Sequence, residues 1–98
     1  MSENVNETIQ IKTEKKAYIN VEKKTAILNI TCKLMYGRFD FINENQIEFN
    51  LINESVEKSK DWIIEVENNL KEEVLREYNQ VKENLKIIEE LGYSLVFQ

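Results

Sequence analysis

The chain has 98 residues, of which 42% are hydrophobic and 32% charged, and it carries a net charge of −5 without any histidine or proline. This length allows one domain with a modest core, residues 1–98, and is too short for two. The lack of histidine removes the commonest general acid–base group and the commonest imidazole metal ligand, and the negative charge disfavours direct binding to nucleic acid or to anionic membranes. We therefore expect a non-enzymatic domain with no cofactor, metal site or catalytic residue.

A single cysteine, Cys32, cannot form an internal disulfide, and no signal-peptide apolar run opens the chain. No apolar run approaches the length of a membrane span. These features predict a cytoplasmic protein. Glu, Lys, Asn and Ile together supply 51 of the 98 residues, a bias that we interpret as that of an AT-rich bacterial or phage genome.

Residues 1–7 are polar and are predicted to be disordered. Residues 8–52 alternate apolar and polar side chains, which is typical of an antiparallel β-meander. The clearest run spans 25–36 and predicts a long central strand. Two shorter strands on either side of a polar turn at 13–16 are expected before it, so that the meander has four or five strands in all.

Three turns set the expected register of this sheet: a turn at Lys23-Lys24, a two-residue type II′ loop at Gly37-Arg38 and a loop at 43–45. All three keep the apolar side chains on one face, and a slip of one residue would move them into water. The expected pairs are Val21 with Ala26, Ile19 with Leu28, Tyr36 with Phe39, Leu34 with Phe41, Phe41 with Ile47, and Phe39 with Phe49.

Residues 53–91 predict one long amphipathic helix that covers the apolar face of the sheet. Their apolar residues recur every three or four positions: Ile63, Val66, Leu70, Val74, Tyr78, Val81, Leu85 and Ile88. Asn53 or Ser55 can cap the start near residue 55, and Gly92 suits a left-handed position just past the end. Such a helix either overhangs the sheet or breaks at 68–69 or 79–80; the lack of Gly and Pro inside it favours one continuous helix. A short strand at 93–97 is expected to follow, next to the chain's own sheet or to a second copy.

Three groups of residues could form a catalytic, metal or nucleic-acid site, and we interpret none of them in that way. Cys32 lies among apolar residues without a neighbouring base, so we expect it to be inert. Asp40 and Glu48 are paired in the expected register, but no third ligand accompanies them. A third group, the lysines of two basic turns, is interpreted as solubilising rather than nucleic-acid-binding: Lys15, Lys16, Lys23 and Lys24.

The most informative surface is the acidic side of the predicted helix, which is flanked by apolar residues that the core does not explain. We expect these residues to bind a protein partner: Glu54, Asp61, Trp62, Ile64, Glu65, Glu72, Leu75, Glu83 and Ile87. The predicted function is a bacterial or phage inhibitor or modulator of a larger protein with a basic surface, such as a nucleic-acid-binding protein of host defence. The alternatives are a homo-oligomeric structural or chaperone-like subunit that uses the sheet face, where Tyr18, Ile27, Met35 and Ile42 interrupt the polar surface, and, third, a small-ligand-binding or enzymatic domain. A homo-oligomer is expected.

Overall fold

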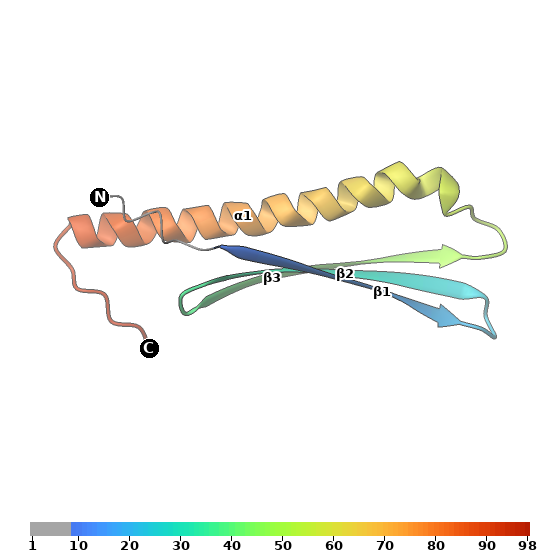
Figure 1. The fold of residues 1–98 in the computed structure, drawn as a ribbon, viewed down its shortest axis with the longest axis horizontal. Coiled ribbons are helices and arrows are strands. Elements are labelled where there is room, and N and C mark those ends of the chain that lie inside the picture. Colours follow the sequence, from blue (N-terminus) through green and yellow to red (C-terminus); the bar gives the residue numbers. More distant parts are fainter. Residues whose placement is uncertain (1–8) are drawn as a thin grey trace.

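The computed structural model describes residues 9–98, which form one antiparallel sheet and one long helix (Figure 1). Its elements follow in the order β1 (Gln10–Asn20), β2 (Thr25–Tyr36), β3 (Phe39–Asn50), a 3-10 helix η2 (Glu57–Ser59) and α1 (Lys60–Glu90). The expected α+β architecture of a meander followed by one helix is confirmed. The disorder predicted for 1–7 concerns residues outside the described range.

Between residues 9 and 98 the sheet has three strands in the order β1-β2-β3, so the expectation of four or five strands is wrong. The polar segments 13–16 and 43–45, expected as turns, lie inside β1 and β3. Thr13 and Asn43 pair with Cys32 from opposite sides. Neither segment contains the Gly or Pro that a tight turn favours, and β2 is long enough to pair with both strands along their whole length.

The turn at Gly37-Arg38 is confirmed, with Tyr36 opposite Phe39 and with the positive φ of +59° that type II′ requires at Gly37. The turn at Lys23-Lys24 is wrong in length, because it spans 21–24 and uses Lys24 at a φ of +57°. The register there shifts by two residues, which keeps Ala17 and Ile19 on the helix side of the sheet but moves Val21 into the turn, where it is 82% exposed. The pairs that replace the wrong expectations are Ile19 with Ala26, Ala17 with Leu28, Leu28 with Ile47, and Ala26 with Phe49.

Helix α1 is continuous, as expected, but it starts at Lys60 rather than near residue 55. Asn50 and Glu54 form a tight turn that delays the start. The Asn50 N–H donates to Glu54 Oε1 (2.6 Å), and the Glu54 N–H donates to the Asn50 carbonyl (2.9 Å). Ser55 Oγ accepts a hydrogen bond from the Lys58 N–H of η2 (3.3 Å) and does not cap α1, whose first turn follows Ser59. The 31 residues of α1 span about 46 Å and a strand of 12 residues about 40 Å, so the expected mismatch in length is small.

Gly92 ends the helix as predicted, with a φ of +100°. The Gly92 N–H donates to the Glu89 carbonyl and the Tyr93 N–H to the Ile88 carbonyl, which is the Schellman arrangement. The strand expected at 93–97 is wrong, since the described tail is irregular. The tail turns back toward the β2–β3 hairpin, where Phe97 packs edge-on against Phe39 with ring centroids 6.0 Å apart (Figure 1). A hairpin tip offers side chains but no open strand edge for pairing.

The core lies between the middle of α1 and the strands β2 and β3. Its buried members are Ile30, Cys32, Leu34, Phe41, Ile47, Phe49, Leu70, Val74 and Tyr78. Every residue of β1 is exposed. A helix about 10 Å wide covers roughly two strands spaced about 4.8 Å apart, so one helix leaves the third strand uncovered.

The fold is consequently thin and long, with principal extents of 60 × 27 × 20 Å. Its radius of gyration is 18.8 Å, whereas a compact domain of this length has about 13 Å. The chain therefore presents much more surface than a globular domain of equal size, and partner binding has to be sought on that surface.

Candidate interaction surface

Five carboxylates form a row along the solvent side of α1, and we call them the acidic row: Asp61, Glu65, Glu72, Glu83 and Glu90. All five are exposed. Their spacing of four, seven or eleven residues places them on one face at about 100° per residue, opposite the buried Leu70, Val74 and Tyr78. None of the five takes part in an ion pair with another residue of the range 9–98, so the row presents negative charge to solvent, relieved mainly by Arg76, which lies beside Glu72 and Glu83.

Glu54 was expected in this row, but it lies before η2 and outside the helix. Its carboxylate accepts the Asn50 N–H at the end of β3. We therefore assign Glu54 to the structure of the β3–η2 connection, and the acidic row begins at Asp61.

The apolar candidates on the helix divide into exposed and packed residues. Trp62 is 51% exposed, Ile64 48% and Ile87 41%, so all three lie outside the core with side chains open to solvent. Leu75 instead is half-buried and packs against the core. At helical spacing Trp62 and Ile87 lie on one flank of the acidic row and Ile64 on the other, which gives the surface a charged centre with apolar margins.

The far side of the sheet carries a second set of exposed apolar residues. Tyr18 is 54% exposed, Met35 49% and Ile42 54%, whereas Ile27 is half-buried among its neighbours. Charged side chains from all three strands separate them, so this side is mixed rather than a continuous apolar surface.

The residues considered for catalysis or metal binding are not brought together. Asp40 pairs with Met35 and Glu48 with Ile27, so the expected Asp40–Glu48 pair is wrong; eight residues of one strand separate them by about 26 Å. Cys32 is fully buried and free. No cluster of acidic or cysteine side chains that could hold a metal ion occurs in the part of the chain that the structure describes.

The expected basic turns are also changed by the structure. Lys15 and Lys16 lie in the middle of β1 and point to opposite faces of the sheet. Lys15 forms an ion pair with Glu67 of α1 (3.2 Å), and Lys16 lies 4.0 Å from Glu14. Lys23 and Lys24 remain in an exposed turn, so no joint basic patch forms.

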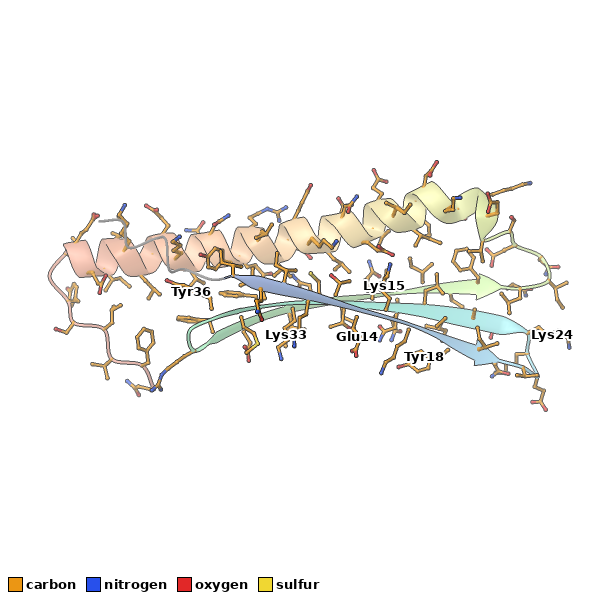
Figure 2. The ribbon with its side chains drawn as sticks, in the orientation of Figure 1. Glu14, Lys15, Tyr18, Lys24, Lys33 and Tyr36 are labelled. Carbon is orange, nitrogen blue, oxygen red and sulfur yellow. The ribbon has the colours of Figure 1, made fainter. Side chains whose placement is uncertain are left out.

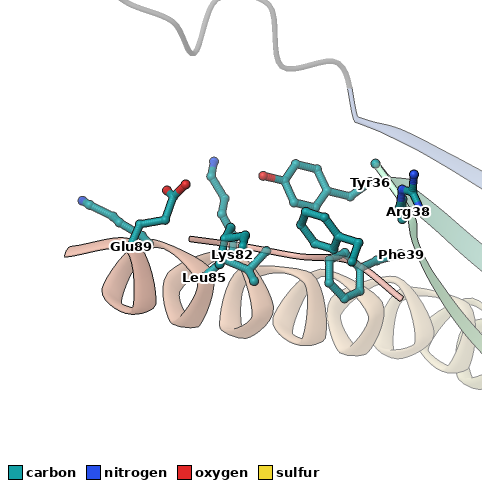
Figure 3. A pocket seen from close by; sticks show the side chains of 10 residues that line it. Tyr36, Arg38, Phe39, Lys82, Leu85 and Glu89 are labelled. Carbon is teal, nitrogen blue, oxygen red and sulfur yellow. The ribbon is translucent and has the colours of Figure 1, made fainter. Parts of the chain in front are cut away.

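A hollow of about 730 Å³ lies between the β2–β3 hairpin, the last turns of α1 and the tail (Figure 3). Tyr36 and Phe39 face it from the hairpin, and Leu85 and Glu89 from the helix. Its volume falls in the range of small-ligand sites. Its charged groups have both signs, with Arg38, Lys82 and Lys86 against Glu89, so the lining carries a net positive charge without selecting a single class of ligand.

Sequence reasoning placed no binding candidate on the edge of β1, although this strand is the most exposed element of the described chain. One helix cannot cover three strands, but the sequence does not indicate which strand stays uncovered.

No helix among residues 9–98 is long and apolar enough to cross a membrane. No known protein family, curated protein or solved structure matches the chain.

Proposed function

We propose that this protein is a non-enzymatic binding module of the cytoplasm that attaches to a basic surface of a larger protein through α1. The observation that carries the proposal is the acidic row, five exposed carboxylates along a rigid helix of 31 residues with no ion-pair partner among the described residues. Such a row attracts a complementary positive surface and speeds its association.

Trp62, Ile64 and Ile87 supply the apolar contacts that charge alone does not provide. Interfaces derive much of their affinity from a few aromatic and aliphatic side chains, with charged residues at the rim. A basic groove that ordinarily holds nucleic acid is a surface of the required sign, so a bacterial or phage modulator of a nucleic-acid-binding host-defence protein is the form of the function that we propose.

Charge reversal on the helix tests this proposal. Proteins captured from the bacterial host by the unaltered chain are compared with those captured by the double variant Glu65→Lys, Glu72→Lys. We expect the partner to be lost from the variant, and its binding to the unaltered chain to weaken steeply as salt is added, because exposed charges are screened within about 10 Å at 0.1 M salt.

The matched control is the double variant Asp40→Lys, Glu48→Lys, which changes the net charge equally but on β3, where both residues are exposed on the sheet side away from the helix. It should retain the partner. Equal loss in both variants would show a general effect of net charge and would contradict a site on α1.

A homo-oligomeric structural or chaperone-like subunit is the second candidate, favoured by the exposed Tyr18, Met35 and Ile42 on the sheet. Binding through these residues should persist at high salt, since apolar contacts are not screened. If Met35→Ala with Ile42→Ala abolished partner binding while the Glu65 and Glu72 reversals left it unchanged, the sheet would be the binding surface.

A further inference from the structure

Strand β1 is an open sheet edge of unusual length. All eleven of its residues are exposed, and in the described chain it pairs with β2 alone, so one row of its backbone N–H and C=O groups has no strand partner. Natural proteins shield such edges with charge, bulges, proline or a covering element. In residues 10–20 there is no proline, the pairing with β2 has no interruption, and α1 lies over β2 and β3 instead. The edge does carry charge, at Lys12, Glu14, Lys15 and Lys16, but these residues have both signs.

We propose that β1 pairs with β1 of a second copy of this chain, antiparallel and centred on Lys15, to form a six-stranded sheet. A twofold axis perpendicular to the sheet produces this arrangement and leaves both helices on the same face. Directly opposite residues in an antiparallel pair share a face. Centring on Lys15 therefore matches the whole of Gln10–Asn20 with itself.

The sequence of β1 is self-complementary in this register. On the side away from α1, Glu14 of each copy lies opposite the partner's Lys16, and Lys12 lies opposite the partner's Tyr18. Figure 2 shows Glu14 and Tyr18 on that side. On the helix side, Ile11 (37% exposed) lies opposite the partner's Ile19 (55% exposed). The symmetry repeats each pair, and opposite charges or aliphatic residues placed directly across strands stabilise a sheet.

The like-charge contact on the axis is Lys15 against the partner's Lys15. Each of these ammonium groups already has a counter-ion in its own chain, because Lys15 Nζ lies 3.2 Å from Glu67 Oε2 on α1. Figure 2 shows Lys15 directed toward the helix. The ion pair offsets the repulsion that two bare lysines would produce at the centre of the interface.

Neighbouring registers lack this match. A shift that centres the pair on Glu14 sets that residue against its own copy and Lys12 against Lys16. A shift that centres it on Lys16 leaves Glu14 opposite Tyr18 and moves Ile19 opposite Thr13. Like charges directly across strands destabilise a sheet, so the side chains favour the register in which both strands overlap fully.

The other open edge, β3, has the opposite character. Its charged residues are Asp40, Glu44 and Glu48, with no Lys or Arg between Phe39 and Asn50. No antiparallel pairing of β3 with its own copy can place opposite charges across the strands, and the register centred on Glu44 sets Glu44 against itself and Asp40 against Glu48. The chain thus has one edge protected by charge and one edge that complements itself, which predicts a closed dimer and not an open ladder of strands.

A charge swap tests the register. We expect the unaltered chain to sediment with twice its mass of 11.7 kDa, Glu14→Lys or Lys16→Glu alone to sediment as a monomer, and the double variant Glu14→Lys, Lys16→Glu to recover the dimer. Both residues are exposed and lie outside the core, and circular dichroism with a thermal melt checks that each variant remains folded. A monomeric unaltered chain, dimeric single variants or a monomeric double variant would each overturn the proposal, as would assemblies that keep growing with concentration.

Disulfide trapping gives a second measurement with a matched control. In Lys15→Cys the new thiols of the two copies face each other across the axis and should cross-link under mild oxidation. In Ala17→Cys they are offset by four residues, about 13 Å along the strand, and should not. The native Cys32 is fully buried and lies opposite Thr13, so it faces neither introduced cysteine. Cross-linking of Ala17→Cys in preference to Lys15→Cys would overturn this register.

Discussion

Glu67 of α1 holds the ammonium group of Lys15 on β1, with its two carboxylate oxygens 3.2 and 3.3 Å from Nζ. The contact joins two elements that share no buried residue, since β1 contributes nothing to the core. Glu67 is 19% exposed on its side chain and Lys15 57%, so the pair is partly shielded from solvent at one end. The pairing with β2 holds the strand in place, and this ion pair adds a direct contact between the uncovered strand and the helix.

This ion pair should contribute measurably to stability. In a double-mutant cycle of Lys15→Ala and Glu67→Ala, we expect a coupling energy of about 0.5 kcal/mol that declines as salt is added. The control cycle uses Lys60 and Glu57, whose side chains are 64% and 80% exposed at 3.8 Å, and should give a smaller coupling. Equal couplings for the two pairs would contradict the shielding of Glu67.

Truncation of buried side chains should lower the free energy of unfolding more than truncation of side chains on the uncovered side of the sheet. Leu34 is fully buried and Phe49 is 4% exposed, so Leu34→Ala and Phe49→Ala should each lower the free energy of unfolding by about 2–5 kcal/mol. Leu28 is half-buried, and Leu28→Ala should cost less than either. Ile42→Ala, at an exposed position on β3, should change stability by less than about 0.5 kcal/mol. Urea unfolding of all four variants measures these differences, and a cost of Ile42→Ala equal to that of Leu34→Ala would refute the assigned faces of the sheet.

Gly92→Ala should destabilise the end of α1 through the backbone alone. A Cβ at Gly92 would meet no atom within 4 Å, yet φ is +100°. The cost is therefore conformational, about 1–2 kcal/mol, and Asn should cost less than Ala because it tolerates left-handed conformations better. Amide exchange of Gly92 and Tyr93, whose N–H groups close the Schellman arrangement, measures the effect. Unchanged protection in Gly92→Ala would show that the left-handed conformation is not needed.

Cys32 should behave as a structural thiol. It is fully buried, paired in the sheet between Thr13 and Asn43, so a thiol reagent should label it slowly in the folded protein and at once in denaturant. Labelling should accelerate in Leu34→Ala if the core opens. Fast labelling of the unaltered folded protein would reopen the question of a reactive cysteine.

The sequence was sufficient for the faces of the sheet and for the helix. Period-two alternation placed Leu34, Phe41 and Phe49 inside, and the spacing of Leu70, Val74 and Tyr78 identified the buried side of α1. Gly37 and Gly92 marked a hairpin and a helix end because both need a positive φ. These are local properties, in which each residue's conformation and its neighbours along the chain are enough to decide the structure.

Strand number and register were not local properties. A loop of three residues at 43–45 and an uninterrupted strand both keep Phe41 and Ile47 on one face, so alternation cannot distinguish them. Only the pairing of both outer strands with the full length of β2 decided that 13–16 and 43–45 are extended. The same long-range pairing separated Asp40 from Glu48.

The sequence by itself therefore determined which side chains lie on the apolar face of the sheet. It also determined where the helix ends and that the outer side of the helix is acidic. The tertiary structure alone decided that α1 covers β2 and β3 and leaves β1 open, because coverage depends on the width of one helix against the width of three strands. That geometric limit, which no stretch of sequence encodes, turns β1 from an ordinary amphipathic strand into an exposed edge.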